Sequence, residues 1–238
     1  MTDAVDAPTP EQLAAALAAA PGRRLGSGYQ ASVELVRTGL GDIVVKRPHG
    51  GVLAALWRYL LRREHAVYSR LGGIAGIPRA YGLVGGEALA LQYIAGPSLR
   101  EADAKLADRE RFFARLLATV LAMHAAGVAH GDLKRRHNVI VGAGEQPYLI
   151  DFGIACLSDG TLGRFAFATF RQMDLNAWLK LKYGRRVDPS IEPGVLSAED
   201  AALYRPLLIE RLARAVRVPW QFLTLRRPRQ RWRARRKR

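Results

Sequence analysis

The sequence predicts an α+β fold in which a strand-rich N-terminal half is followed by a helix-rich C-terminal half. Short apolar runs separated by glycines occupy residues 22–95, a pattern typical of β-strands joined by tight turns. Apolar residues then recur at helical spacing over residues 109–126. Gly96-Pro97 lies between these two regions and interrupts regular structure. We therefore expect the boundary between the halves near residue 95.

The N-terminal half begins with a helix and continues with strands. Thr9 precedes Pro10, and Gln12 follows three residues after Thr9, which is the signature of a capped helix start. Pro21-Gly22 would end this helix. Strands are expected at about residues 30–37, 43–46, 81–84 and 88–94, and a helix at about 52–71 that a glycine-rich segment terminates.

The C-terminal half carries its own start signals. Ser98 with Glu101 forms a capping-box pattern, and Asp108 can cap the helix over residues 109–126. Two short apolar runs, 139–141 and 148–150, flank Gly142-Ala143-Gly144 and predict a hairpin, and the chain beyond Gly153 is expected to be mostly helical. The expected organisation is a helical extension at 1–21, an N-terminal lobe at 22–95, a C-terminal lobe at 96–218 and a basic tail at 219–238.

Charge and cysteine content limit the class of protein. The chain has 238 residues and a formal net charge of +16, and residues 226–238 hold nine Lys or Arg without an acid. Such a charge favours polyanionic surroundings such as phosphorylated ligands, nucleic acid or an anionic membrane surface. The one cysteine, Cys156, excludes an intrachain disulfide. Without a signal-peptide pattern or a run of about 18 apolar residues, we expect a cytoplasmic protein, either soluble or peripheral at the inner face of the membrane.

Three patterns in the N-terminal half are suited to binding phosphate. Gly26-Ser27-Gly28, followed by Val33, can bring backbone N–H groups close to phosphate oxygens. Lys46 ends an apolar strand and can hold phosphates as a point charge, and Glu64 follows 18 residues later on a predicted helix. Taken singly, the glycines also fit a plain hairpin turn, Lys46 also fits an edge-strand lysine in solvent, and Glu64 also fits a surface ion pair.

The fourth pattern is the most specific. It reads His130-Gly131-Asp132-Leu133-Lys134 through to Asn138, and Asp151-Phe152-Gly153 follows. Asp132 can accept the proton of a hydroxyl group or orient it, and Lys134 can neutralise charge on a phosphoryl group. Asn138 and Asp151 offer hard oxygen donors of the kind that Mg²⁺ prefers.

The order of these four patterns resembles the protein-kinase-like fold over roughly residues 22–180. The resemblance implies a two-lobed molecule with a small antiparallel sheet in the N-lobe and a mostly helical, reduced C-lobe. It further implies ATP and Mg²⁺ as cofactors. By resemblance Asp132 and Lys134 are catalytic and Asn138 and Asp151 bind the metal. Nucleotide-binding positions would be Gly26, Ser27, Gly28, Val33, Lys46, Glu64, Gln92 and Ile94, with residues 92–96 as the hinge that meets adenine.

The departures from the family pattern are informative. Asn138 follows Asp132 by six residues, where the family spacing is five. Asn138 leads directly into the apolar strand and is our preferred ligand, with His137 as the alternative. Gly131 replaces the Arg that normally pairs with a phosphorylated activation loop, and the chain contains no Ala-Pro-Glu triplet. Asp174 is expected to brace the catalytic loop, as in RIO-type and bacterial lipopolysaccharide core kinases, which this region resembles.

The predicted function is an ATP-dependent kinase with a hydroxyl acceptor. The Asp132-Leu133-Lys134 triplet resembles serine/threonine protein kinases, whereas the missing activation-segment motifs and the basic tail favour a lipopolysaccharide sugar. The aromatic and basic residues of 219–238 predict binding to an anionic membrane surface. The alternative is a pseudokinase-like nucleotide-binding module or a nucleic-acid-binding module. The presence of Lys46, Asp132, Asn138 and Asp151 disfavours the first, and the second depends on charge alone.

Overall fold

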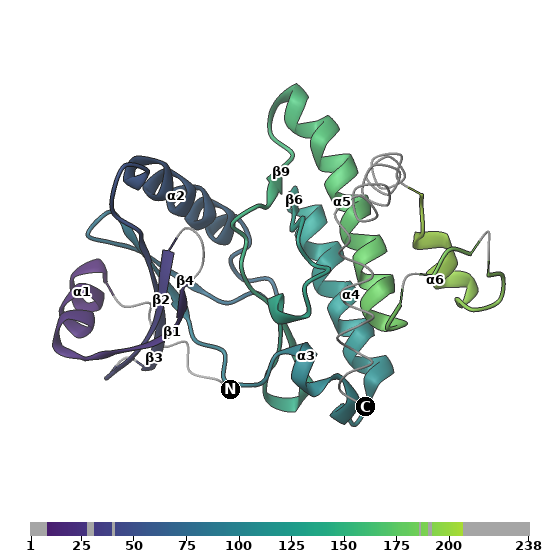
Figure 1. Ribbon diagram of the computed structural model, residues 1–238, viewed down its shortest axis with the longest axis horizontal. Helices are drawn as coiled ribbons and strands as arrows, with labels where there is room; N and C mark the ends of the chain where they lie inside the picture. The colour runs from purple at the N-terminus through teal and green to yellow at the C-terminus, as the bar shows by residue number, and fades with distance from the viewer. Residues whose placement is uncertain (1–8, 28–30, 40, 186, 190–191, 207–238) are drawn as a thin grey trace, which may run out of the picture. The chain divides into compact units, whose positions relative to one another are not determined.

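The computed structural model describes residues 9–27, 31–39, 41–185, 187–189 and 192–206. The chain divides into two compact units, residues 1–184 and 185–238, and each is described by itself. The first unit is α+β and two-lobed, with a sheet-bearing N-lobe and a helical C-lobe (Figure 1). The predicted fold class is therefore confirmed.

The N-lobe is built on a five-stranded antiparallel sheet in the order β1-β2-β3-β5-β4. Its strands are β1 (Gly22–Ser27), β2 (Ala31–Thr38), β3 (Gly41–Pro48), β4 (Ala80–Val84) and β5 (Ala88–Gln92). Helix α1 (Pro10–Ala19) precedes the sheet and begins with the expected capping box between Thr9 and Gln12. Helix α2 (Ala54–Arg70) connects β3 to β4.

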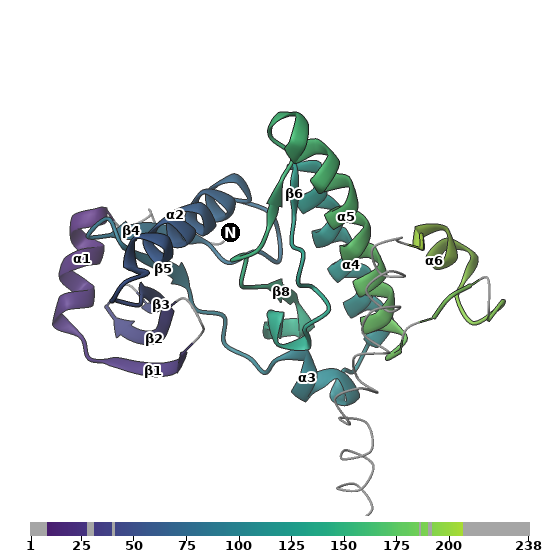
Figure 2. The same ribbon diagram turned by 45° about the horizontal axis from the view of Figure 1, so that its top comes forward.

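The alternation of side chains along β3 gives the sheet two different faces. Ile43 and Val45 are fully buried in a cluster with Leu13 and Leu17 of α1, so α1 covers this face. Val44 and Lys46 point to the opposite face, where they line a cavity together with residues of α2. Figure 2 shows α1 and α2 on either side of the strands. Period-2 alternation thus separates the face that packs against α1 from the face that lines the cavity.

The C-lobe is centred on two long helices. These are α4 (Arg109–Ala125) and α5 (Gly160–Lys182), with the short α3 (Leu99–Ala102) before them. Trp178 of α5 is buried, and its indole N–H donates to the Phe113 carbonyl oxygen at 3.0 Å. The aromatic rings of Phe113 and Trp178 also pack edge to face. These contacts fix the two helices to each other.

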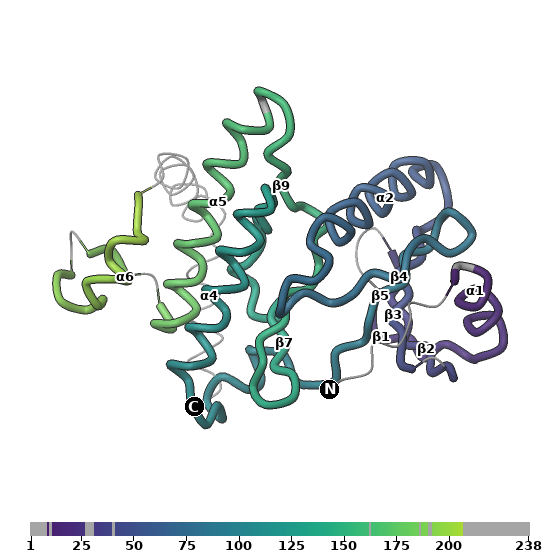
Figure 3. The backbone as a smooth tube through the Cα atoms, turned by 180° about the vertical axis from the view of Figure 1, so that it is seen from behind, coloured from purple at the N-terminus to yellow at the C-terminus, as the bar shows by residue number. Residues whose placement is uncertain are grey.

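Two small antiparallel ribbons and single turns of 3₁₀ helix complete the C-lobe. One ribbon pairs β6 (Val128–Ala129) with β9 (Cys156–Leu157), and the other pairs β7 (Val139–Val141) with β8 (Pro147–Leu149). The 3₁₀ turns span Asp103–Lys105, Arg136–Asn138 and Ala143–Glu145. Figure 3 shows the β7 hairpin from behind. The ribbons bring the two loops that carry Asp132 and Asp151 to adjacent positions.

The second unit contributes one short helix to the described residues, α6 (Ala198–Leu203). Ser197 caps α6 by accepting from the Asp200 N–H. Arg185 pairs with Glu192, and the Tyr204 hydroxyl donates to Asp188 at 3.2 Å. The basic tail predicted at 219–238 lies outside the described residues.

Most of the predicted elements are present near their expected bounds, and two features were not predicted. Strand β1 was not expected because Gly22-Arg23-Arg24-Leu25-Gly26-Ser27 has no apolar alternation. It forms at the sheet edge through pairing with β2. The β6–β9 ribbon was also missed, because each strand has two residues. Within the described segments, no helix has the length and apolar character needed to cross a membrane.

Candidate active site

A cavity of about 750 Å³ lies in the first unit and is lined by residues of both lobes. Its volume falls in the range of about 300–1,000 Å³ that is typical of ligand sites. Apolar side chains from the N-lobe sheet form much of its wall. They include Leu25, Ala31, Val33, Val44 and Leu91. The polar lining residues include Lys46, Glu64, Asp132, Lys134, Asn138 and Asp151.

Lys46 connects the two lobes through its ammonium group. The Lys46 Nζ lies 2.6 Å from the Glu64 Oε1 and 3.4 Å from the Asp151 Oδ1. Both the Lys46 and the Glu64 side chains are largely buried. Burial acts to lower the pKa of Lys46, but attraction to Glu64 and Asp151 outweighs it, so the pKa is raised. A charged ammonium group is therefore held among the polar residues that line the cavity.

Tyr68 joins this arrangement and was not predicted from the sequence. Its hydroxyl oxygen accepts a hydrogen bond from the Asp151 N–H at 3.2 Å. The Tyr68 and Phe152 rings pack edge to face with centroids 5.0 Å apart. Burial is the largest effect that raises the pKa of Tyr68, which keeps the phenol neutral. The available signal was its position four residues after Glu64, on the same face of α2.

The catalytic-loop candidate Asp132 is held by backbone interactions. His130 Nδ1 accepts from the Asp132 N–H at 3.3 Å, which assigns the proton to Nε2, and Nε2 donates to the Ile150 carbonyl oxygen at 3.1 Å. Asp174 accepts from the N–H groups of His130 and Gly131 at 2.7 and 2.9 Å. The expectation that Asp174 braces this loop is confirmed.

The surroundings of Gly131 explain why a glycine, and not the arginine of the family pattern, stands at this position. Its φ is +77°, and a Cβ at this position would lie 2.8 Å from ring atoms of Phe170. The ring of Phe170 on α5 therefore occupies the space that a side chain would need. An Arg at this position would require the backbone and α5 to move.

Asn138 and Asp151 both line the cavity and carry side-chain oxygen atoms. The Asn138 amide nitrogen donates to the Asp132 carbonyl oxygen at 3.1 Å, so its Oδ1 is left to accept or to bind a cation. Burial acts to raise the pKa of Asp151, but Lys46 outweighs this effect and the pKa is lowered, which keeps the carboxylate ionised. In the described part of the chain, no three His, Cys, Asp or Glu side chains gather at a metal site. Two oxygen donors fit Mg²⁺ that takes its remaining ligands from water and phosphate.

His137 is the alternative metal ligand to Asn138, but one of its ring nitrogens is hydrogen-bonded to Arg100. The Arg100 Nη1 lies 2.9 Å from the His137 Nε2. A guanidinium can only donate, so this Nε2 is the acceptor and its lone pair is engaged. His137 is exposed, whereas Asn138 is 6% exposed and leads into β7. The geometry favours Asn138 as the ligand.

The predicted nucleotide-binding positions occupy the N-lobe side of the cavity. Val33, Lys46, Glu64, Gln92 and Ile94 all line it. Gly26 and Ser27 end β1, next to the lining residue Leu25. Gly28 lies outside the described residues. The glycine loop is thus described only up to Ser27.

The hinge passes directly from β5 to the C-lobe. The N–H groups of Gln92 and Tyr93 donate to the carbonyl oxygens of Arg79 and Asp42. Ile94 makes no hydrogen bond with the described residues through its backbone groups, which leaves them for a ligand. Gly96 has a φ of +151°, and a Cβ there would lie 2.0 Å from the Val141 carbonyl oxygen. The close approach of the hinge to β7 therefore requires glycine.

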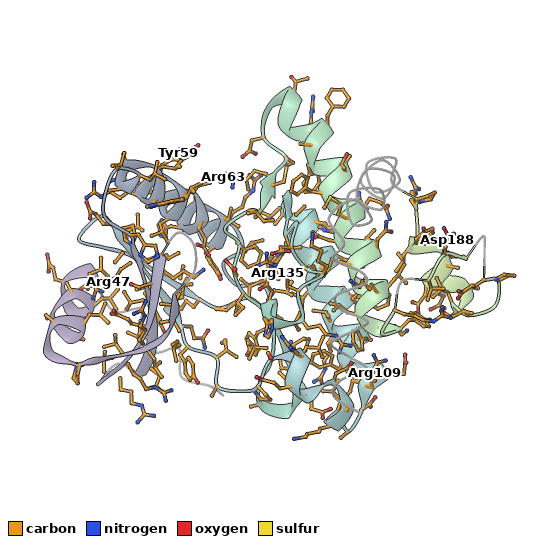
Figure 4. All side chains as sticks on the ribbon, viewed as in Figure 1. Arg47, Tyr59, Arg63, Arg109, Arg135 and Asp188 are labelled. Atoms are coloured by element: carbon orange, nitrogen blue, oxygen red, sulfur yellow. The ribbon has the colours of Figure 1, made fainter. Side chains whose placement is uncertain are left out.

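Two arginines of α2 reach the segment that follows Gly153. Arg63 donates to the carbonyl oxygen of Ala155. The Arg70 Nη1 lies 2.8 Å from both carboxylate oxygens of Asp159. Figure 4 labels Arg63 on α2, at the side of the helix that faces the C-lobe. The sequence analysis predicted neither contact.

Comparisons with known proteins agree with this architecture. Residues 88–161 match the family described as "Phosphotransferase enzyme family". A rice protein (Oryza sativa subsp. japonica) provisionally named cyclin-dependent kinase F-2 is 32% identical over 149 residues, 56% of this chain and 45% of its own length. A second rice protein, provisionally named CBL-interacting protein kinase 13, is 34% identical over 84 residues, 34% of this chain and 16% of its own.

The chain thus spans less than half the length of each of these relatives. The matched region includes the hinge, the catalytic loop and the segment around Asp151. Together with the two-lobed structure, these similarities support a protein-kinase-like fold.

Proposed function

We propose that the chain is an ATP- and Mg²⁺-dependent kinase that transfers the γ-phosphoryl group to a hydroxyl acceptor. The observation that carries this proposal is the position of Lys46, 2.6 Å from Glu64 and 3.4 Å from Asp151, in one cavity with Asp132 and Asn138. The cavity therefore brings together a cationic side chain, three carboxylates and an amide, which are the kinds of group that phosphoryl transfer requires. When bound, Mg·ATP supplies the transferable phosphoryl group and a metal ion that neutralises its charge.

Each residue has a distinct part in this proposal. Lys46 binds the phosphates of the nucleotide, and Glu64 keeps its ammonium group aimed at them. Asn138 and Asp151 would hold Mg²⁺. Asp132 accepts the proton of the acceptor hydroxyl as the acceptor oxygen bonds to phosphorus and the bond to the β–γ bridging oxygen breaks.

Two further groups would complete the site. Lys134 is exposed at the mouth of the cavity and can stabilise the phosphoryl group during transfer. The apolar wall that contains Val33 would cover the adenine ring, and Gly26, Ser27 and Gly28 would approach the phosphates. Gln92 and Ile94 would meet the adenine edge through the hinge.

The proposal is tested by transfer of labelled γ-phosphate from ATP to a panel of cell-envelope lipids and proteins. Replacing Asp132→Ala should leave ATP binding nearly unchanged and lower the transfer rate by about 10²–10⁴. Arg111→Ala is a control outside the cavity and should behave as the wild type. Near-normal turnover by Asp132→Ala would remove this residue from the proposed role.

For the acceptor, two classes fit the proposal: Ser/Thr of a protein and a sugar of lipopolysaccharide core type. The names of the plant relatives favour the first class. The short segment between Gly153 and the start of α5 at Gly160 favours the second, because it offers little surface on which a peptide could dock. The same panel separates them.

The basic tail, which lies outside the described residues, would bring the enzyme to an anionic membrane surface at the inner face. Each cationic residue near such a surface contributes about 1 kcal/mol, and salt screening reduces this considerably. Deleting residues 226–238 should abolish salt-sensitive sedimentation with anionic vesicles and leave ATP hydrolysis unchanged. Undiminished binding after the deletion, or equal binding to neutral vesicles, would exclude this role.

The second candidate function is a non-catalytic nucleotide-binding or nucleic-acid-binding module. The charge of +16 is its support. ATP hydrolysis measured with and without Mg²⁺, together with RNA binding, distinguishes the two candidates. Tight RNA binding without any phosphoryl transfer would favour the second.

A further inference from the structure

Arg135 forms an ion pair with the carboxylate that the proposed reaction requires. The Arg135 Nε lies 2.8 Å from the Asp132 Oδ2, and both residues line the cavity. The Asp132 side chain is 11% exposed, whereas the Arg135 side chain is 66% exposed. Figure 4 labels Arg135 between the N-lobe and helices α4 and α5. An exposed guanidinium thus covers a nearly buried carboxylate on its open side.

This position conflicts with the approach of an acceptor. An acceptor hydroxyl must come within hydrogen-bond distance of the Asp132 carboxylate, and Arg135 already occupies one of the two oxygens. The Arg135 side chain is 66% exposed, so an anion from solution can reach its guanidinium and take the place of Asp132. A guanidinium pairs best with phosphate or carboxylate, to which it donates two parallel hydrogen bonds.

Among the neighbouring cationic side chains, Arg135 is the one that can exchange Asp132 for an anion of the acceptor. Arg136 is not among the residues that line the cavity, and it lies 2.5 Å from Asp103, a carboxylate that Arg109 also contacts. Arg100 is engaged with His137. Lys134, also exposed at the cavity, belongs to the nucleotide phosphates in the proposed function.

Peptide docking finds little support in the C-lobe. Its described strands, β6 to β9, are two or three residues long and are paired in ribbons. An extended peptide that adds to a sheet needs a longer free edge for its main-chain hydrogen bonds. A compact acceptor whose recognition depends on its own charge fits this surface better.

We propose that Arg135 determines acceptor specificity: it covers Asp132 in the free protein and turns to a phosphate group that a sugar acceptor carries beside its hydroxyl. The inference rests on the proposed kinase function and names its substrate class as phosphorylated sugars. Neutral and cationic hydroxyl compounds leave Arg135 on Asp132 and are poor acceptors.

The test uses the full chain and acceptors in matched pairs that differ only in a phosphate. Glucose is compared with glucose 6-phosphate, mannose with mannose 6-phosphate, and a serine peptide with the same peptide bearing an adjacent phosphoserine. The wild type should prefer the phosphorylated sugars by about 10–100-fold in kcat/KM, the range expected for a hydrogen bond to a charged group. Arg135→Gln should reduce this preference to about twofold or less, chiefly through KM, and Arg135→Lys should retain part of it.

The chain offers a matched control in Arg111, which pairs with Asp108 at 3.6 Å with the same three-residue spacing, on the surface of α4. Arg111→Ala should leave the preference unchanged. Equal use of both members of each sugar pair, with no effect of Arg135→Gln, would overturn the inference while the kinase function stands. Preference for the phosphopeptide over the phosphorylated sugars would overturn the substrate class. Absence of both ATP binding and γ-phosphoryl transfer would instead count against the proposed function.

A second measurement does not depend on turnover. The ¹⁵Nε resonance of Arg135, assigned by its loss in Arg135→Gln, is followed during titration of the ADP- and Mg²⁺-containing protein with glucose 6-phosphate. A saturable shift that glucose does not produce supports the inference. No shift from glucose 6-phosphate, or the same shift from glucose, overturns it.

Discussion

Asp174 offers the sharpest test of how the catalytic loop is held. Its carboxylate is buried and accepts three hydrogen bonds, from the His130 and Gly131 N–H groups at 2.7 and 2.9 Å and from the His124 Nε2 at 3.1 Å. In Asp174→Asn, the amide oxygen can replace Oδ2 and keep two of these. The amide nitrogen then faces the Gly131 N–H, donor against donor. One buried, charge-assisted hydrogen bond is lost, which should cost about 1.5–3 kcal/mol.

Asp174→Ala removes both acceptor oxygens and with them all three hydrogen bonds, which leaves two backbone N–H groups and the buried His124 Nε2 without their partner. We expect a loss of about 3–5 kcal/mol, similar to breaking a buried charged pair, against the 5–15 kcal/mol usual for a whole domain. The free energy of unfolding is measured by urea titration with circular dichroism. A displaced loop should also lower kcat by about 10²-fold, because catalysis is sensitive to shifts of about 1 Å.

Asp108→Asn is the matched control, since Asp108 caps α4 at the surface and Asn is an equally good cap. Its free energy of unfolding should stay within about 0.5 kcal/mol of the wild type. If Asp174→Asn were as stable as this control, the bonds from the Asp174 carboxylate could not be what holds the loop, and the reasoning would be refuted.

Four further predictions follow from the site. Gly131→Ala should lose about 1–3 kcal/mol of stability, from the left-handed backbone and the contact with Phe170. Adding Phe170→Ala should remove the part of this loss that comes from the contact, and a single variant as stable as the wild type in urea titration would contradict the prediction. Asn138→Ala should abolish the Mg²⁺ response while His137→Ala has a mild effect, and the reverse ranking would make His137 the ligand. Because the pKa of Asp151 lies below its ordinary 3.8, its stabilising effect is complete above that pH and lost as pH falls through the lower folded value. Urea titrations from pH 7 to 2.5 should therefore show a smaller acid loss for Asp151→Asn than for the wild type. Protein shown to be unphosphorylated by mass spectrometry should be active, and an inactive product that a partner kinase switches on would contradict this.

Local sequence patterns predicted the elements whose structure is determined locally. The capping residues Thr9, Ser98 and Asp108 begin helices as expected. The hairpin around Gly142 also forms where turn residues separate two apolar runs. In these cases the signal and its cause lie within a few residues of each other. Strand β1 differs, because it depends on pairing with β2 rather than on its own composition.

The site was predictable only as a set of residues, and their contacts were not. The order from Lys46 to Asp151 indicated which groups belong together, since phosphoryl transfer needs those residue types. Tyr68 and Arg135 escaped prediction because a Tyr inside a helix and an Arg inside a basic run carry no pattern of their own. Their partners, the Asp151 N–H and the Asp132 carboxylate, are set by the tertiary structure.

We expect the contacts of α2 to hold the proposed site together without an activation-loop phosphate. Arg63 and Arg70 of α2 bind the segment between Gly153 and α5, through the Ala155 carbonyl oxygen and the Asp159 carboxylate. The Arg70 pair is exposed and contributes little alone.

Two contacts hold neighbouring positions of α2. Arg63, which is half-buried, donates to the Ala155 carbonyl oxygen, and the buried Tyr68 hydroxyl accepts from the Asp151 N–H. Glu64 lies between them and is thereby held within reach of Lys46. In a kinase that depends on phosphorylation, new Arg–phosphate pairs supply such ordering. We expect the side chains of α2 to supply it here, because Gly131 stands where such kinases carry the arginine that pairs with an activation-loop phosphate.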